Sequence, residues 1–248
     1  LMRLSRQFWS STQSCATILS QFVIMLLLSR ILTPADFAFY AINVSIIQIA
    51  IIFSEMGIGQ YLIKENNICQ TKLGEFLGAT IITSVSILIF LDIICLLIAK
   101  NIPSLNINVS YFWTLSLSIL LFSVKSISFS FLQRQGRHVN TACAELSAQC
   151  CNVCVSFFIA LTYQSYWALA LGYLSYYFVS TFICIIKVPV LPRLQFQRII
   201  EIKKFAANFI FLKIIDLITR SLDNLILAST MSSYDVGIYH RATNMRNL

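Results

Sequence analysis

The apolar run Phe76–Ala99, FLGATIITSVSILIFLDIICLLIA, contains a single charged residue, Asp92. As one helix, at 1.5 Å per residue, it is long enough to cross the roughly 30 Å hydrocarbon core of a bilayer. Across all 248 residues, 58% are apolar and 11% are charged, whereas about 25% are charged in typical soluble domains. A soluble protein of this size could not bury so much apolar surface. The composition therefore excludes a soluble enzyme, a nucleic-acid-binding module and a disordered chain.

Seven apolar segments follow one another along the chain with short connections, and the four prolines lie between them, where helix breakers belong. Runs this long favour helices over a membrane β-barrel. We therefore expect an all-α fold, a polytopic transmembrane helix bundle. The expected spans are about 9–31, 37–56, 76–99, 111–132, 140–162, 166–187 and 205–229.

Lysine and arginine are distributed unequally between the two sets of connections. One side carries only Arg30 and Lys100. Since cytoplasmic connections are enriched in basic residues, the other side, with the N-terminus, is predicted to be cytoplasmic. The net charge of +8 then reflects topology, and no nucleic-acid partner is expected. The cytoplasmic set is Arg3, Arg6, Lys64, Lys72, Arg134, Arg137, Lys187, Arg193, Arg198, Lys203 and Lys204.

The eight cysteines lie almost entirely in apolar runs, where cysteine acts as a small hydrophobic residue. Cys151 and Cys154 have the spacing of a redox or metal motif, but no second ligand pair accompanies them. Neither His138 nor His240 belongs to a ligand or catalytic cluster. We expect no disulfide framework, no metal site and no cofactor.

An internal repeat relates the end of the first span to the end of the seventh. At an offset of 199, residues 26–40 resemble residues 225–239, with two leucines, an aspartate and a tyrosine recurring. Six intervening spans preserve orientation, so the repeat is parallel. We expect an N-terminal six-helix lobe (1–188), a cytoplasmic inter-lobe linker (189–204) and the start of a C-terminal lobe (205–248), in a fragment of a protein nearly twice as long.

The seventh span carries four charged residues on one helical face, at steps of three, four and three. This stripe is either a self-neutralising ladder that packs the helix or the charged wall of a water-filled cavity. The residues are Lys213, Asp216, Arg220 and Asp223.

The first span carries a polar stripe, Ser14, Thr17 and Gln21, at the positions that the repeat relates to the first three charges. If the two lobes face each other, both stripes line a shared central cavity. Hydrogen bonding between helices is the alternative role for such side chains.

Three charges lie inside other spans. Lys125 and Glu145 have similar predicted depths, which favours a structural ion pair over a cargo site. Asp92 has no obvious partner at its depth and is either a proton or cation site or a neutral, hydrogen-bonded acid.

Five stretches resemble motifs of the polysaccharide biosynthesis exporters, which include the O-antigen flippases. The resemblance runs over almost the whole chain in the same order, with Glu55 where aspartate is usual and Ala38 where glycine is usual. The stretches are Ile31–Ala38 (ILTPADFA), Phe53–Gln60 (FSEMGIGQ), Leu132–Arg137 (LQRQGR) with Glu145, Ser165–Leu169 (SYWAL), and Leu222–Ile226 (LDNLI) with Val236–Tyr239 (VGIY).

This resemblance implies a flippase of the multidrug/oligosaccharidyl-lipid/polysaccharide exporter superfamily in the bacterial inner membrane. Its cargo would be an undecaprenyl-pyrophosphate-linked oligosaccharide, with membrane lipids and a polysaccharide polymerase as further partners. Arg220 and Lys213 could bind the pyrophosphate, while Ser14, Thr17 and Gln21 could bind sugar hydroxyls. Asp216, Asp223 and Asp92 are candidate cavity or ion-coupling acids, and no catalytic residue is required.

Two other functions remain open. A cation-coupled multidrug exporter of the same superfamily would need acids to dominate the cavity. A membrane polysaccharide polymerase or ligase would be expected to carry a large external loop with catalytic residues, and the external loops here are short and hold no histidine.

Overall fold

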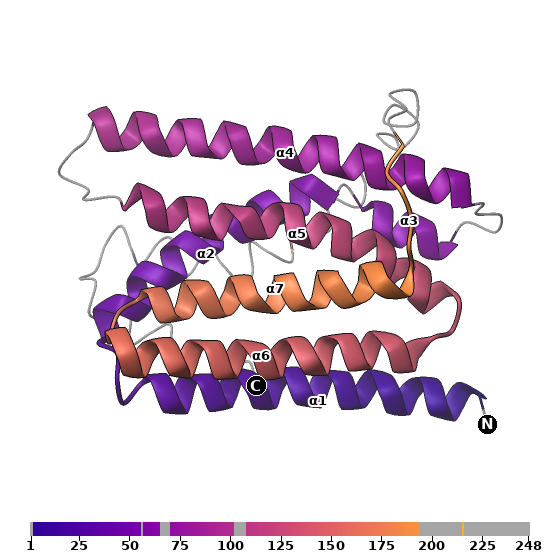
Figure 1. The fold of residues 1–248 in the computed structure, drawn as a ribbon, viewed down its shortest axis with the longest axis horizontal. Helices are drawn as coiled ribbons and strands as arrows, with labels where there is room; N and C mark the ends of the chain where they lie inside the picture. Colours follow the sequence, from indigo (N-terminus) through magenta and orange to yellow (C-terminus); the bar gives the residue numbers. More distant parts are fainter. Residues whose placement is uncertain (1, 56, 65–69, 102–107, 194–214, 216–248) are drawn as a thin grey trace.

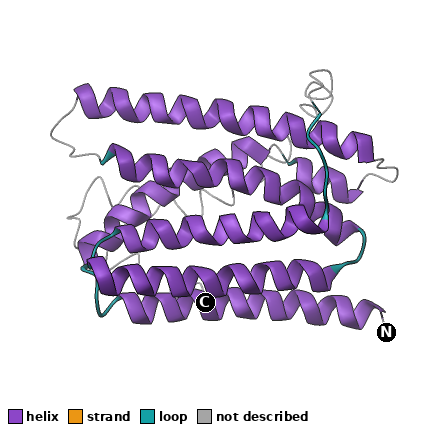
Figure 2. Ribbon diagram, viewed as in Figure 1, coloured by secondary structure: helices purple, strands orange, loops and turns teal. Residues whose placement is uncertain are grey.

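The structure, a computed structural model, describes residues 2–55, 57–64, 70–101, 108–193 and 215. Within these ranges all regular structure is helical, and six helices are long and apolar enough to cross a membrane. This confirms the all-α transmembrane fold class (Figure 2). The expected seventh span, 205–229, lies outside the described residues. The helices are α1 (Met2–Leu28), α2 (Pro34–Glu55), α3 (Ile58–Lys64), α4 (Gln70–Asn101), α5 (Val109–Arg134), α6 (His138–Tyr163) and α7 (Trp167–Lys187).

The long helices run alongside one another, and the direction reverses from each long helix to the next along the chain. In Figure 1, α4, α5, α7, α6 and α1 lie in succession, and α2 crosses behind them to pack against α4 and α5. Because the direction alternates, the C-terminal ends of α5 and α7, at Arg134 and Lys187, lie at the same end of the bundle as the start of α1. Lys100 closes α4 at the opposite end. The basic residues are therefore grouped as the positive-inside argument requires; the orientation in a membrane stays a prediction.

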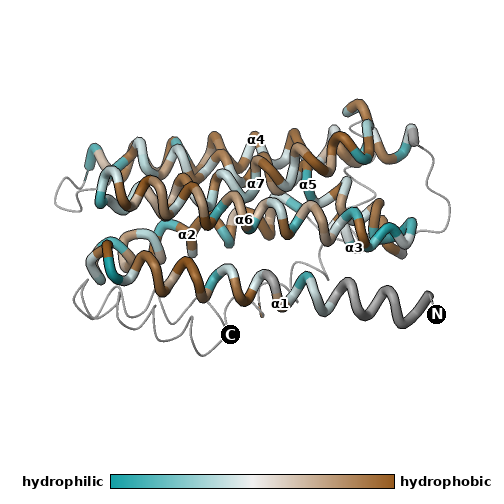
Figure 3. The backbone as a smooth tube through the Cα atoms, turned by 60° about the horizontal axis from the view of Figure 1, so that its bottom comes forward, coloured by the Kyte–Doolittle hydropathy of each residue, from teal (hydrophilic) through white to brown (hydrophobic). Residues whose placement is uncertain are grey.

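The outer surface of the bundle is apolar, and much of the helix packing inside it uses small polar residues. Large exposed hydrophobic side chains follow the outer faces of α4, α6 and α7, and Figure 3 shows the apolar character of these helices. Helix α5, the most buried span, instead packs a series of serines against its neighbours. Small residues let transmembrane helices approach closely, and apolar residues suit contact with lipid. The buried serines of α5 are Ser116, Ser118, Ser123, Ser126, Ser128 and Ser130.

Helix α2 begins three residues before the expected start of its span, because a capping motif precedes it. The backbone N–H and the hydroxyl of Thr33 both donate to Asp36 Oδ2, at 2.9 and 2.6 Å. Asp36 N–H donates back to Thr33 Oγ1 at 3.4 Å. This is a capping box with Pro34 in the first helical turn, where its missing N–H costs no hydrogen bond. The Thr-Pro-Ala-Asp stretch therefore has a local structural role, which is to cap the N-terminus of α2.

Two other motif stretches end helices with left-handed glycines. Gly136, with a φ of 71°, follows α5, where the N–H of Gly136 donates to Gln133 O and the N–H of Arg137 to Leu132 O, both at 3.0 Å. This Schellman arrangement reverses the chain into α6. Gly57, with a φ of 69°, turns the chain from α2 into the short helix α3, which we did not expect.

The Tyr-Trp motif before α7 forms an aromatic cluster at the opposite end of the bundle. The rings of Tyr166 and Trp167 pack on Tyr111, with centroid distances of 5.1 and 5.3 Å. Phe39 of α2 lies 5.0 Å from the same tyrosine ring. The amide of Asn108 donates to the Tyr166 hydroxyl at 2.9 Å and its oxygen caps α5. The cluster joins α2, α5 and α7 at this end.

Candidate functional site

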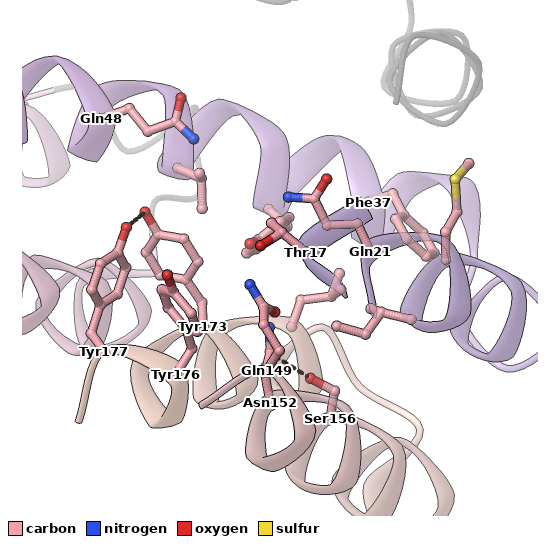
Figure 4. A pocket seen from close by; sticks show the side chains of 15 residues that line it. Thr17, Gln21, Phe37, Gln48, Gln149, Asn152, Ser156, Tyr173, Tyr176 and Tyr177 are labelled. Atoms are coloured by element: carbon pink, nitrogen blue, oxygen red, sulfur yellow. Dashed lines mark hydrogen bonds between the residues drawn. The ribbon is translucent and has the colours of Figure 1, made fainter. Parts of the chain in front are cut away.

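A cavity of about 350 Å³ lies between α1, α2, α6 and α7 (Figure 4). Helix α2 packs chiefly against α4 and α5, which leaves room between it and the other three helices. The lining combines amides, hydroxyls and aromatic rings, and none of the described lining residues carries a charge. The residues are Thr17, Gln21, Ile24, Met25, Phe37, Tyr40, Val44, Gln48, Gln149, Asn152, Ser156, Leu169, Tyr173, Tyr176 and Tyr177.

Helical spacing brings the polar residues to one wall. On α6, Gln149, Asn152 and Ser156 recur at steps of three and four, so they share the face that α6 turns toward the cavity. Gln21 of α1 joins them from the neighbouring helix. We call Gln21, Gln149 and Asn152 the amide wall.

Hydrogen bonds orient two amides of this wall. Gln149 is 7% exposed, and its Oε1 accepts from the hydroxyl of Ser20 on α1 at 2.9 Å. Asn152 Oδ1 accepts from Ser156 Oγ at 3.2 Å. With its oxygen held by α1, Gln149 directs its amide nitrogen toward the centre of the cavity (Figure 4). The wall therefore presents hydrogen-bond donors.

Three tyrosines of α7 form the opposite side, which we call the tyrosine wall. The hydroxyls of Tyr173 and Tyr177 lie 3.3 Å apart and share a hydrogen bond. The ring of Tyr177 packs edge-on against both Tyr173 and Tyr176, with centroid distances of 4.9 Å. Tyr40 of α2 extends the group, with its ring 6.3 Å from that of Tyr173. These contacts fix the rings as a rigid aromatic surface.

A buried ion pair lies next to the tyrosine wall. Lys125 Nζ of α5 is 2.7 Å from Glu145 Oε1 of α6, and the two side chains are 8% and 9% exposed. The lysine also donates to the Tyr176 hydroxyl at 2.8 Å, and that hydroxyl donates to Glu145 Oε2. The structure thus pairs the two charges that the sequence placed at one depth, and Tyr176 connects them to the cavity. The network spans α5, α6 and α7.

Glycine at position 172 allows α6 and α7 to approach closely behind the amide wall. A β-carbon at Gly172 would overlap Ser156 Oγ. It would also lie 2.6 Å from Asn152 Oδ1 and 3.1 Å from Ser156 Cβ. Any larger residue would have to displace these side chains or separate the helices. Gly172 is therefore part of what places the polar residues of α6.

The polar stripe expected on α1 reaches the cavity in part. Thr17 and Gln21 line it, and the Thr17 hydroxyl donates to Gln13 O at 3.0 Å. Ser14, one turn earlier, is exposed and is not among the lining residues. Two of the three predicted sugar contacts thus lie at one site.

Of the predicted cavity acids and cations, only Asp92 lies within the described residues, and it does not line this cavity. Asp92 lies on α4, outside the lining, and Ser116 Oγ of α5 donates to its Oδ2 at 3.4 Å, a partner that the sequence did not suggest. Asp92 Oδ1 is a buried oxygen without a hydrogen-bond partner among the described residues. The charged stripe of the seventh span lies outside the described residues: Lys213, Asp216, Arg220 and Asp223.

Few of the lining residues were predicted from the sequence, because most of them are neutral and intramembrane charges are the stronger signal of a site. The signal was nevertheless present, since the amides of α6 and the tyrosines of α7 recur at helical spacing within apolar spans. Neutral polar residues in a span are costly without partners and so point to a packed interface or a wet cavity. The missed polar residues are Tyr40, Gln48, Gln149, Asn152, Ser156, Tyr173, Tyr176 and Tyr177.

A comparison with known protein families gives a match. The model of a family described as "Polysaccharide biosynthesis protein" matches residues 27–248, which include α2, α6 and α7 of the cavity but not the lining residues of α1. No curated protein and no solved structure matches the chain.

Proposed function

The chain belongs to the polysaccharide biosynthesis protein family, and on that premise we propose that the whole protein moves a lipid-linked oligosaccharide across the bacterial inner membrane by alternating access. The cargo is an undecaprenyl-pyrophosphate-linked sugar unit for O-antigen or another surface polysaccharide. The N-terminus is cytoplasmic in this proposal. No bond is made or broken, so the protein acts as a transporter and not as an enzyme.

The observation that carries the proposal is a hydrogen-bonding cavity inside a bundle with an apolar outer surface. Polar groups at membrane depth are unfavourable unless they find partners. Four amides, two aliphatic hydroxyls and four tyrosines meet in this cavity. Sugar hydroxyls, which both donate and accept hydrogen bonds, are suitable partners for them. None of the described lining residues carries a carboxylate, which favours a sugar cargo over a cationic drug.

The pyrophosphate head needs cations, and these come in the proposal from the seventh span. Their spacing in the sequence predicts that Lys213 and Arg220 share a helical face with Asp216 and Asp223. In this arrangement the acids keep the cations charged inside a wet cavity at modest cost, and coupling ions could use the same acids. The planar guanidinium of Arg220 can hold two phosphate oxygens at once, which an ammonium group cannot do.

Substitution of Arg220 in the full protein tests this assignment. The expected span 205–229 would place Arg220 about 15 residues from its cytoplasmic end, or about 22 Å at 1.5 Å per residue, which is too deep to reach cytoplasmic water by snorkelling. We expect Arg220→Ala to insert at normal levels but to lose surface polysaccharide, and Arg220→Lys to retain part of it. The measurements are membrane abundance by immunoblot and polysaccharide by gel. Normal polysaccharide with Arg220→Ala would contradict a cargo role and leave the stripe a packing element.

A further inference from the structure

We propose that the cavity binds a mono- or disaccharide portion of the cargo built from uncharged sugars. In this proposal the tyrosine wall lies against one face of a sugar ring and the amide wall bonds to its hydroxyl or acetamido groups. The inference rests on the proposed function and deepens it, because it assigns the class of sugar and the side chains that select it.

The tyrosine wall offers ring surface, and its hydroxyl groups are partly satisfied within the protein. The Tyr176 hydroxyl accepts from Lys125 and donates to Glu145. The hydroxyls of Tyr173 and Tyr177 bond to each other. The C–H bonds on one face of a pyranose are weakly positive, and the face of an aromatic ring is negative, so the two attract. The ion pair therefore acts as a positioning element that holds Tyr176 in place.

The amide wall supplies the complementary polar contacts. Ser20 occupies the oxygen of Gln149 and Ser156 occupies the oxygen of Asn152, so both nitrogens can donate to a ligand. Gln21 enters the same space from α1 (Figure 4). An amide can serve a sugar hydroxyl as donor or acceptor. A ring with an apolar face and polar edges, as in hexoses and acetamido sugars, suits two such walls.

The charge of the site selects against acidic sugars. None of the described lining residues is charged, and Lys125 and Glu145 neutralise each other beside the cavity. Among the described residues, the carboxylate of a uronic acid would find no unpaired counter-ion in this cavity, and its desolvation would be strongly unfavourable. The pyrophosphate is common to every cargo of this kind and is assigned above to the seventh span.

The volume of the cavity limits the size of the sugar that it can bind. Its volume of about 350 Å³ lies at the lower end of the range of small-ligand pockets, roughly 300–1,000 Å³. A cavity of this volume can hold a mono- or disaccharide but not a whole oligosaccharide with its lipid. The site would therefore bind only a short part of the glycan.

The test uses the full protein in proteoliposomes with two cargo lipids. Both carry the same polyprenyl pyrophosphate, one with an N-acetylglucosamine disaccharide and the other with a disaccharide that contains a uronic acid. We expect the uncharged cargo to cross at least about tenfold faster, the factor that a 1.4 kcal/mol difference gives. Equal rates for the two cargos would overturn the inference and leave the proposed function intact. No movement of either cargo would contradict the proposed function itself.

Two variants and a matched control test whether the residues of the two walls contact the sugar. Loss of one or two hydrogen bonds in Gln149→Leu should slow the uncharged cargo by about tenfold, and Tyr173→Leu should slow it as well. Ser147→Leu makes the same polar-to-leucine change on the exposed side of α6, about 200° around the helix from Gln149, and should leave the rate unchanged. Protein recovered in the vesicles is measured for each variant. Wild-type rates in both cavity variants would overturn the inference.

Discussion

Replacement of Lys125 with methionine is expected to remove most of the protein from the membrane. Lys125 Nζ lies 2.7 Å from Glu145 Oε1 in a pair that is more than nine-tenths buried. Removal of one partner of a buried pair leaves an uncompensated charge and typically costs about 3–5 kcal/mol. Since folded proteins are stable by only about 5–15 kcal/mol, this is a large part of the total. The Tyr176 hydroxyl would also lose its donor.

The paired change separates structure from cargo binding. In Lys125→Met with Glu145→Gln no charge is left buried, so membrane abundance should recover substantially. Lys187→Met, which removes an exposed lysine at the end of α7, is the matched control and should have normal abundance. Immunoblots of membrane fractions compare all three variants with wild type. Normal abundance of Lys125→Met with loss of surface polysaccharide would show instead that Lys125 contacts the cargo.

Substitution of Gly172 with alanine is expected to cause the second large loss. The added β-carbon would overlap Ser156 Oγ and crowd Asn152 Oδ1. Overpacking of this kind costs about 1–3 kcal/mol because neighbours must shift from their preferred rotamers. It would also push α6, which carries Gln149 and Asn152, away from α7, which carries the tyrosine wall. The thermal midpoint of the purified protein and its membrane abundance should both fall.

A second change beside this glycine provides the control. Ser156→Ala removes the oxygen that the new β-carbon would overlap and leaves Asn152 Oδ1 at 2.6 Å and the β-carbon of residue 156 at 3.1 Å. The end of the Asn152 side chain, released from its hydrogen bond to Ser156, can rotate away, and a small shift relieves the second contact. We expect Gly172→Ala with Ser156→Ala to recover most of the lost stability, and Ser156→Ala alone to have a small effect. Full stability of Gly172→Ala by itself would mean that α6 and α7 are not packed as closely as the structure shows.

The helical bundle was predictable because membrane crossing constrains composition strongly. Each of the six described spans is a long apolar run that hydropathy alone locates, although α1 begins at Met2 and α4 at Gln70, seven and six residues before the expected spans. Errors occurred at the helix ends. The Thr33–Asp36 capping box starts α2 earlier than hydropathy predicts, and α3 is too short and too polar to register as a span.

The candidate site was predictable only in part, because it depends on how neutral side chains of different helices meet. Thr17 and Gln21 were expected from the repeat, but Ser14 is one turn away from the lining. The depth argument also placed Lys125 beside Glu145, since charges in apolar surroundings need partners. No pairwise rule, however, joins Gln149 of α6 to Ser20 of α1, or Tyr176 to that ion pair. Such contacts depend on helix rotation, which hydropathy does not determine.

Translocation by the purified full protein tests the central proposal most directly. Proteoliposomes would carry a fluorescent polyprenyl-pyrophosphate-linked oligosaccharide of uncharged sugars, and a membrane-impermeant reagent would quench the label in the outer leaflet. We expect the fraction quenched to rise with time in vesicles that contain the protein, and to stay at the level of protein-free vesicles with Arg220→Ala. A fraction that stays at the protein-free level with well-folded wild-type protein would contradict the account.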